Sequence, residues 1–151
     1  MPIIEIKGDL LASDCDTIAH GCNCFNTMGS GIAYQIKVKY PGAWKADFFG
    51  TRAGDKNKLG TFTKAQCKDK LIYNLYIQYD YGRLNKVYLE YDKLEQTLEA
   101  MKQDLVSLDI YASSKLGLPH VGCGLAHGDW NIVKQIIERI FFDKIIYVYS
   151  L

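Results

Sequence analysis

The chain has 151 residues, of which 48% are apolar and 23% charged, the balance of a soluble globular protein. Its 18 Lys and Arg residues face 17 Asp and Glu residues, which excludes a basic field large enough for extended nucleic-acid binding. No apolar run approaches the roughly 20 residues of a membrane span, and the N-terminal MPIIEIKGDLL lacks the apolar core of a signal peptide. We expect one domain, residues 1–151, without membrane association.

The five cysteines are odd in number and scattered, unlike the cysteines of a disulfide framework. Because no export signal precedes them, we expect reduced thiols and a cytoplasmic protein. Cys22 and Cys24 are separated by one residue, which is too close for a zinc knuckle, and no second Cys/His pair follows. We therefore expect neither a metal nor another cofactor.

The first third of the chain alternates strand and helix patterns. Short runs of strand formers predict strands at 3–7 and 17–22. Residues 31–39 are helix-like and stop at Pro41, because a proline disfavours helix in the residue before it. A second short helix is expected to begin at Pro41 and to run through Phe48, since proline suits the first turn of a helix.

The remaining two thirds continue the alternation. Strands are expected at 60–66 and 71–78, with CKDK as the turn between them. Apolar residues then recur at steps of three and four and predict the clearest helix of the chain: Tyr91, Leu94, Leu98, Met101, Leu105 and Leu108. A strand at 116–121 precedes a helix that Asp129 caps, and the chain closes on the buried strand KIIYVYSL. The apolar face of that last helix is expected to be Ile132, Val133, Ile136, Ile137 and Ile140.

This alternation predicts an α/β fold with a mixed central sheet that helices cover on both faces. In such sheets, ligands bind at the carboxyl ends of the strands, where strand-to-helix loops gather. Two loops of this chain fit that description, residues 23–31 and 122–129.

Both loops place glycines directly before a helix, as MGSG before IAYQI and GCGLAHGD before WNIVKQII. Glycine lets the backbone approach a ligand closely, and a helix start offers unpaired N–H groups with partial positive charge. Together the loops can hold a diphosphate without lysine. The alternative is that both are ordinary strand-to-helix turns, since neither matches the dinucleotide-binding fingerprint or a P-loop.

Five blocks in a fixed order carry a family resemblance: GDL at 8–10, IAHGCN at 18–23, GSGIAYQI at 29–36, VGCGLAHGDW at 121–130 and the terminal VYSL. Together they resemble the macrodomain family over nearly the whole chain. The similarity is greatest to the branch of ADP-ribose 1″-phosphate phosphatases and the terminal ADP-ribose protein glycohydrolase. The resemblance implies a three-layer α/β/α fold with ADP-ribose in a cleft across the top of the sheet.

The resemblance also implies roles for individual residues. Asp9 is similar to the residue that accepts the adenine amino group, with the Leu10 backbone beside it, and Tyr149 to the ring that stacks on adenine. Asn23 resembles the residue that holds the distal ribose. The first phosphate loop would be Gly29, Ser30, Gly31 and Ile32, and the second Gly122, Cys123, Gly124 and Leu125. Other readings stay open: Asp9 as a turn residue, Asn23 as an Asx-turn and Tyr149 as a core residue.

Catalytic roles are expected of two residues, His20 as a general acid or base and Asn23 as the group that positions water or the ribose. His20 can equally be a buried core residue. The glycohydrolase branch has a lysine where this chain has Gln78 and an aspartate where it has Ala126, and glutamine cannot form a covalent adduct with the sugar. Gln78 and His127 are candidate contacts of the distal ribose. Cys123 is expected to be a loop residue rather than a nucleophile.

The expected function is removal of the 1″-phosphate from ADP-ribose 1″-phosphate. The alternatives are a non-catalytic ADP-ribose reader and a hydrolase that removes ADP-ribose from modified proteins or nucleic-acid ends. The expected partner is ADP-ribose or a derivative, bound by a monomer. The aromatic-rich segment NLYIQYDYGRLNKVYLEY, residues 74–91, is either a rim over the cleft or a contact surface, and Gly82 with the neighbouring charges favours the rim.

Overall fold

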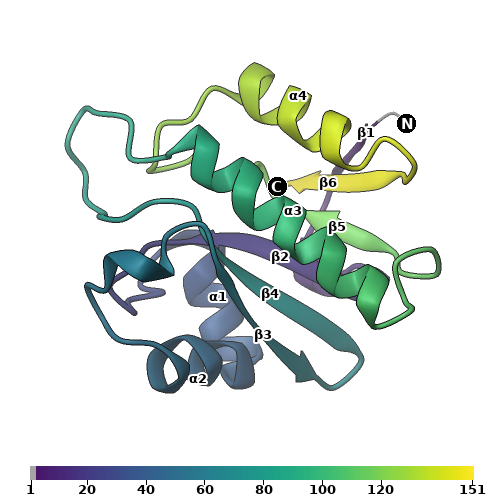
Figure 1. The fold of residues 1–151 in the computed structure, drawn as a ribbon, viewed down its shortest axis with the longest axis horizontal. Coiled ribbons are helices and arrows are strands. Elements are labelled where there is room, and N and C mark those ends of the chain that lie inside the picture. Colours follow the sequence, from purple (N-terminus) through teal and green to yellow (C-terminus); the bar gives the residue numbers. More distant parts are fainter. Residues whose placement is uncertain (1–2) are drawn as a thin grey trace.

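The computed structural model describes residues 3–151, which form six strands and four α-helices around one sheet (Figure 1). The strands are β1 (Ile3–Lys7), β2 (Thr17–Cys22), β3 (Phe62–Cys67), β4 (Lys70–Tyr76), β5 (Leu116–Leu118) and β6 (Ile146–Ser150). The helices are α1 (Gly31–Lys39), α2 (Pro41–Gly50), α3 (Tyr91–Ser107) and α4 (Trp130–Ile140). Short 3₁₀ helices at Leu10–Ala12 and Lys56–Lys58 were not expected from the sequence.

The sheet has the strand order β1-β6-β5-β2-β4-β3, and only the edge strand β3 runs antiparallel to its neighbour. Helices α1 and α2 cover one face and α3 and α4 the other, which gives three layers (Figure 1). The expected mixed sheet between helices is therefore confirmed. Because the parallel strands end at the same edge, the loops after β2, β4 and β5 meet there.

Each face of the sheet carries its own core. One cluster joins α3 and α4 to the sheet through residues such as Leu98, Met101 and Ile137. The other joins α1 and α2 to it through Ile36 and Ala43. Successive side chains of a strand point to opposite faces, so β2 and β4 contribute to both clusters.

The expected apolar faces of the two long helices are largely correct. Leu94, Leu98, Met101 and Leu105 of α3 are fully buried. Tyr91 is only partly buried, and two expected members are exposed: Leu108, the C-cap of α3, and Ile132 of α4. Ile132 lies in the first turn of α4, where the face that meets the sheet begins at Val133.

The expected strands at 60–66, 71–78 and 144–151 are each shifted or shortened by a few residues, and the strand at 116–121 is shortened to half. The run at 116–121 is a strand only over Leu116–Leu118, because Pro119 has no N–H for the ladder. The Val121 N–H then donates to the Pro119 carbonyl at 2.8 Å and turns the chain. Residues 119–121 thus become part of the edge at which the loops gather. Among residues 3–151, no helix is long and apolar enough to cross a membrane.

Candidate ligand-binding site

A cavity of about 480 Å³ lies at the carboxyl ends of β2, β4 and β5. Both glycine loops reach it, the first through residues 27–31 and the second through Gly122 and Gly124. The predicted site residues on its wall are Asn23, Gly29, Ser30, Gly31, Ile32, Gln78, Gly122, Gly124 and Leu125. The sequence expectation that the two loops meet at one sheet edge is therefore confirmed.

The first loop presents an uncapped helix start to the cavity. Ser30 is the N-cap of α1, but its side chain makes no capping hydrogen bond, so the first N–H groups are left available. Gly31 has a φ of 58°, in the left-handed region, and a Cβ added there would meet no atom within 4 Å. The left-handed backbone favours a glycine here, and the open space beside it leaves room for a ligand. The arrangement is suited to an anion.

A buried lysine holds this loop against α2. Lys58 is almost fully buried, and its ammonium donates to the Asn26 side chain and, at 3.5 Å, to the Cys24 carbonyl. It also pairs with Asp47 at 3.5 Å. Asp47 Oδ1 accepts from the Tyr76 hydroxyl at 2.6 Å, while Asp47 Oδ2 has no hydrogen-bond partner among residues 3–151. Asp47 also borders the cavity. Sequence reasoning missed this tether because Lys58 stands in a KNK run that resembles an exposed turn.

Asn23 forms the Asx-turn that was one of its expected roles and also borders the cavity. Its Oδ1 accepts the Phe25 N–H at 2.8 Å, which is an Asx-turn, and its Nδ2 donates to Thr27 Oγ1 at 2.8 Å. The same residue lines the cavity. The second lone pair of Oδ1 and the second N–H of Nδ2 are not used by these two bonds. The turn therefore holds the amide rigidly while leaving capacity for a ligand.

The second loop is closely folded on itself. Gly122 has a φ of 74°, and a Cβ on Gly128 would lie 2.5 Å from the Gly122 carbonyl oxygen, so neither position accepts a side chain without a shift. A Cβ on Gly124 would meet nothing within 4 Å, because Gly124 faces the cavity. Unlike α1, α4 has a side-chain cap: Asp129 Oδ1 accepts from the Asn131 N–H at 2.9 Å, as expected.

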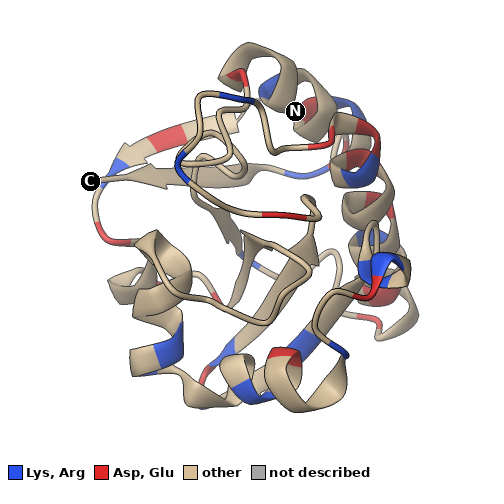
Figure 2. Cartoon of the chain, turned by 90° about the vertical axis from the view of Figure 1, so that its left-hand side faces the viewer, with Lys and Arg blue, Asp and Glu red and all other residues tan. Residues whose placement is uncertain are grey.

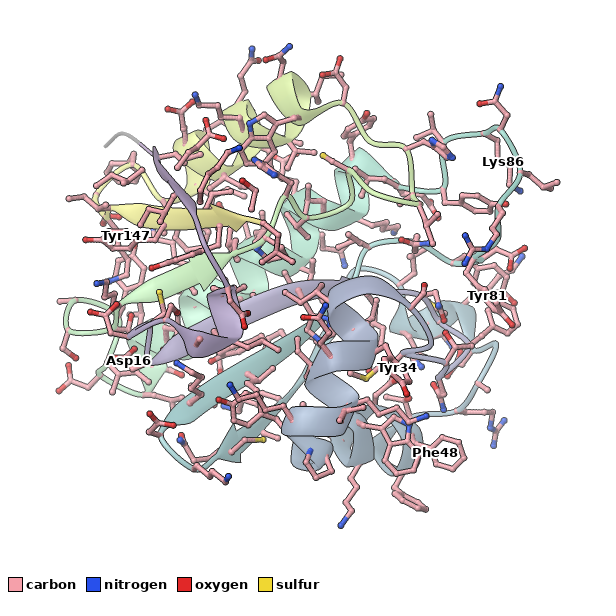
Figure 3. All side chains as sticks on the ribbon, turned by 180° about the vertical axis from the view of Figure 1, so that it is seen from behind. Asp16, Tyr34, Phe48, Tyr81, Lys86 and Tyr147 are labelled. Atoms are coloured by element: carbon pink, nitrogen blue, oxygen red, sulfur yellow. The ribbon has the colours of Figure 1, made fainter. Side chains whose placement is uncertain are left out.

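The segment at 79–90 forms a third wall between the two loops. Tyr81, Gly82 and Arg83 line the cavity, as the rim interpretation predicts. Figure 3 shows Tyr81 and Lys86 on this segment, which projects beyond the sheet on the same side of the molecule as Tyr34 of α1. Figure 2, viewed from the side of this segment, shows mostly uncharged chain across this end of the molecule.

No protein-family model matches the chain, but curated relatives do. An uncharacterised 17.5 kDa protein of enterobacteria phage T4 is 33% identical over 155 residues, covering 91% of this chain and 89% of the phage protein. The ADP-ribose glycohydrolase OARD1 of Homo sapiens is 30% identical over 152 residues, covering 99% and 91% of the two chains. The ADP-ribose 1″-phosphate phosphatase of Saccharomyces cerevisiae is 27% identical over 174 residues, covering 99% and 98%.

Solved structures share the fold. The macrodomain of Mycobacterium tuberculosis DarG superposes with a TM-score of 0.79 at 22% identity, covering 99% of this chain and 98% of that one. This chain belongs to the macrodomain family. Thermosipho africanus DarTG, solved in complex with ADP-ribose, superposes with a TM-score of 0.77 at 18% identity, covering 97% of this chain and 41% of that one.

The placement of His20 in this macrodomain favours the alternative interpretation as a core residue over the expected catalytic role. The side chain is fully buried in β2 under α2 and is not on the cavity wall. Its Nε2 lies 2.6 Å from Asn74 Oδ1, and Asn74 in turn donates to the Ala43 carbonyl at 2.9 Å. Burial lowers the pKa of His20 to about 4, so the imidazole is neutral at pH 7. His20 therefore has the surroundings of a satisfied core histidine, and its catalytic role stays an untested prediction.

The residues expected to hold adenine lie outside the cavity, at the edge formed by β1 and β6. Asp9 Oδ1 accepts the Leu11 N–H at 3.0 Å and caps the turn at Leu10–Ala12, although Asp9 itself is exposed. Leu10 is buried. Tyr149 is half-buried beside Gly8, where an added Cβ would lie 3.7 Å from the ring. An adenine role for Asp9 and Tyr149 stays a prediction.

Three other candidates have distinct surroundings. Gln78 lines the cavity, and its Nε2 donates to the Asp80 carbonyl at 2.9 Å. His127 is exposed with a φ of 60° and is not on the cavity wall. Cys123 is also absent from the wall, and burial raises the pKa of its thiol to about 11. The thiol is therefore protonated at neutral pH, consistent with a loop residue rather than a nucleophile.

One histidine was given no role by the sequence and does line the cavity. His120 Nε2 lies 3.0 Å from Glu5 Oε1, and its ring packs edge-on against Trp130 with 4.4 Å between centroids. The only signal for it in the sequence was its place after Pro119, at the end of a strand. Within residues 3–151, no group of three or more His, Cys, Asp or Glu residues is arranged to hold a metal ion.

Proposed function

We propose that this macrodomain binds ADP-ribose in the cavity and is a hydrolase that removes the 1″-phosphate from ADP-ribose 1″-phosphate. One observation carries the proposal: two glycine loops and the uncapped start of α1 border a single cavity together with the Asn23 amide. Backbone N–H groups at such a place bind phosphate without a lysine. The names of the human and yeast relatives, an ADP-ribose glycohydrolase and an ADP-ribose 1″-phosphate phosphatase, support the ligand.

The strand order suggests how the ligand lies. Adenine would rest at the β1 and β6 edge near Asp9 and Tyr149, and the diphosphate between the two glycine loops. The distal ribose would then reach Asn23, which follows β2, and Gln78, which follows β4. Because β2 and β4 are neighbours in the sheet, these two side chains lie on the same side of the diphosphate position.

The proposed reaction is attack of water on the terminal phosphorus. The bond between phosphorus and the 1″ oxygen breaks, and the products are inorganic phosphate and ADP-ribose, with a water proton passing to the leaving oxygen. The chain contributes positioning through the Asn23 amide and stabilisation of negative charge through the loop N–H groups. His20 is given no part in this reaction, because its side chain is fully buried and does not line the cavity.

The cavity favours phosphate removal over lysine-dependent cleavage of a glycosidic bond. Gln78 and Ala126 both line the cavity at the positions where the glycohydrolase branch, by the sequence resemblance, has its lysine and aspartate. An amide nitrogen is not nucleophilic, so Gln78 cannot form a covalent adduct with the ribose. Binding without turnover would make the protein a reader of ADP-ribose instead.

Phosphorus NMR on ADP-ribose 1″-phosphate mixed with the purified protein tests the proposal. We expect inorganic phosphate to accumulate while the diphosphate resonances persist as those of ADP-ribose. Gly124→Val should abolish turnover and binding, because its side chain occupies open cavity space without strain in the backbone. Gly50→Ala is the matched control, since Gly50 also faces open space but lies at the end of α2, away from the cavity wall.

Each result has a distinct meaning. Diphosphate resonances that shift without release of phosphate would identify a reader and remove the phosphatase activity from the proposal. Unchanged spectra would show that the protein neither binds nor hydrolyses ADP-ribose 1″-phosphate, which would contradict the whole proposal. Loss of activity in Gly50→Ala as well as Gly124→Val would show that the glycine substitutions act on folding rather than on the cavity.

We also propose that the macrodomain acts as a monomer in a reducing compartment such as the cytoplasm. Side chains and backbone of one chain make up the described cavity wall, so a single copy suffices for binding. All five cysteines are free, and four of them are buried in the core cluster on the α1 and α2 side of the sheet.

A further inference from the structure

Arg83 is a cation on the cavity wall that no protein group engages. It belongs to the segment at 79–90 and is exposed. Within residues 3–151, its guanidinium takes part in no ion pair, hydrogen bond or ring contact. The nearby cation Lys58, in contrast, is buried and donates to three protein groups.

Arg83 also supplies the wall with its permanent positive charge. Among the described residues that line the cavity, it is the only Lys or Arg, and Asp47 is the only carboxylate. A guanidinium offers several N–H donors in one plane, which match two oxygens of a phosphate at once. The remaining phosphate-binding groups are backbone N–H groups of the loops, which are polar but uncharged.

The segment that carries Arg83 is attached at both ends to the phosphate-binding loops. Toward the first loop, the Cys24 N–H donates to the Tyr79 carbonyl at 3.0 Å, and the Phe25 ring packs against Tyr81 with 6.0 Å between centroids. Toward the second loop, the Tyr88 N–H donates to the Ala126 carbonyl at 2.8 Å. Arg83 is thus held in a strap that crosses between the two loops.

The interior of the strap is fixed as well. The Tyr88 hydroxyl accepts the Leu84 N–H at 3.3 Å, and a Cβ on Gly82 would lie 2.6 Å from that hydroxyl. Gly82 also has a φ of 157°, so the backbone there passes close over Tyr88. These contacts hold the backbone around Gly82 against the buried Tyr88, while the Arg83 side chain next to it stays exposed.

The side of the cavity on which the strap lies decides what Arg83 meets. The strap follows β4 and Gln78 in the chain. The proposed adenine edge is formed by β1 and β6, which lie at the other end of the strand order. A ligand that lies as proposed turns its distal ribose toward β2 and β4. Arg83 then faces the substituent on the 1″ carbon.

We propose that Arg83 is the specificity residue of this site and binds the terminal phosphate of ADP-ribose 1″-phosphate. This inference rests on the proposed function, because it takes the orientation of ADP-ribose from it. Arg83 contributes little to ADP-ribose itself, since the loop N–H groups already hold the diphosphate. A substitution of Arg83 is therefore expected to change the recognition of ADP-ribose 1″-phosphate much more than the affinity for ADP-ribose. The test must compare these two changes rather than measure either one alone.

The test compares Arg83→Gln with the wild-type protein on both ligands. Calorimetry gives the Kd of ADP-ribose, and initial rates give kcat/KM for ADP-ribose 1″-phosphate. We expect Arg83→Gln to lower kcat/KM at least tenfold and to leave the Kd of ADP-ribose within twofold. Arg83→Lys should recover part of the loss, because a lysine keeps the charge but not the paired donors.

Lys86→Gln is the matched control. Lys86 lies in the same strap, but its ammonium sits over the Tyr88 ring, 4.7 Å from the centroid, and it does not line the cavity. We expect Lys86→Gln to keep both the kcat/KM for ADP-ribose 1″-phosphate and the Kd of ADP-ribose within twofold of wild type. An equal loss in Lys86→Gln would overturn the inference, because it would show a general charge effect.

Other outcomes separate this inference from the proposed function. If the wild type binds both ligands without turnover, the phosphatase proposal fails, and the same comparison is made with two Kd values. If Arg83→Gln weakened the recognition of both ligands equally, Arg83 would be a contact of the diphosphate that they share. That result would overturn the inference. The inference would also be overturned if Arg83→Gln left both the kcat/KM for ADP-ribose 1″-phosphate and the Kd of ADP-ribose unchanged. The same holds if the wild-type protein bound neither ligand.

Discussion

At the scale of single residues, His20 shows how burial decides chemistry. A histidine at the end of a strand beside a glycine loop has the residue type of a general acid or base, but its side chain points into the core under α2. There it hydrogen-bonds Asn74, and burial lowers its pKa to about 4. In the unfolded chain the ordinary value near 6.5 returns. The residue therefore links stability to pH rather than serving the reaction.

We predict that His20 makes the protein less stable as the pH falls from about 6.5 to about 4. In that window the unfolded state binds the proton and the folded state does not, so the free energy of unfolding decreases. The difference between the two pKa values corresponds to a loss of at most about 3 kcal/mol. Urea unfolding of the wild type and of His20→Gln at pH 7 and pH 4 measures this loss. The carboxylates contribute equally in both proteins, so the difference between the two proteins reports on His20.

His20→Gln should lose less stability than the wild type over the same pH interval and should keep its turnover within a few-fold. Parallel pH profiles of the two proteins would contradict the linkage. A variant that folds with unchanged stability at pH 7 but has lost turnover would restore a catalytic role for His20. Gln is chosen because its amide can still donate to Asn74 Oδ1.

At the scale of elements, the first glycine loop depends on the layer behind it. Lys58 in the 3₁₀ helix connects Asp47 of α2 with Cys24 and Asn26 of the loop. Thr51, directly after α2, adds a hydrogen bond from its hydroxyl to Asn26 Oδ1 at 3.1 Å. The site is therefore positioned by α2, although α2 contributes only Asp47 to the cavity wall.

We predict that Lys58→Met lowers both stability and affinity. Removing one partner of a buried ion pair leaves Asp47 uncompensated, which costs about 3–5 kcal/mol. The loop also loses its tether, so the Kd of ADP-ribose should rise at least tenfold. Urea unfolding and calorimetry measure the two effects. Lys56→Met, two residues away and exposed, is the matched control and should change stability by less than about 0.5 kcal/mol.

The double variant Asp47→Asn, Lys58→Met separates the ion pair from the tether. It removes the unpaired charge, so part of the stability should return, whereas the weakened affinity should persist because Cys24 and Asn26 still lack their donor. Recovery of both properties together would contradict the tether. It would show instead that Lys58 acts on the loop only through overall stability.

At the scale of the whole molecule, the two cores are built on one sheet. Strands β2 and β4 supply Ala19 and Tyr73 to the α3 and α4 side and Ile18 and Ile72 to the α1 and α2 side. Loss of either helical layer would expose one face of the same strands. The two layers are therefore expected to unfold together, as one domain over residues 1–151.

We predict one cooperative unfolding transition reported identically from both layers. Trp44 lies in α2 and Trp130 in α4, so Trp44→Phe and Trp130→Phe each leave a probe on one side of the sheet. Their urea transitions should coincide. Leu98→Ala and Ile36→Ala, one in each core, should each lower the stability seen by both probes by about 2–5 kcal/mol.

Val38→Ala is the control for these core substitutions, because Val38 is 65% exposed and should change stability by less than about 0.5 kcal/mol. Transitions that separate between the two probes would contradict a single cooperative unit. A core substitution that affected only the probe on its own side would do so as well.

The local sequence pattern was enough to predict most of the helices and strands and to indicate the family. The helix at 31–39 and the strand at 17–22 were predicted with the boundaries that the structure has, because Pro41 and the glycines mark their ends. The order of the five blocks, from GDL to VYSL, indicated a macrodomain. These features depend on residues close together in the chain, where side-chain period and backbone restriction act directly.

The tertiary structure alone decided which polar residues face the cavity. His20 and Asn23 are three residues apart, yet one is buried in a strand and the other lines the site. The surroundings of Lys58, His120 and Arg83 exist only where distant segments meet: Lys58 at Asn26, His120 at Glu5, and Arg83 on the strap between the loops. Residue type and spacing determine what a side chain can do, but burial and the approach of distant segments determine whether a ligand can reach it.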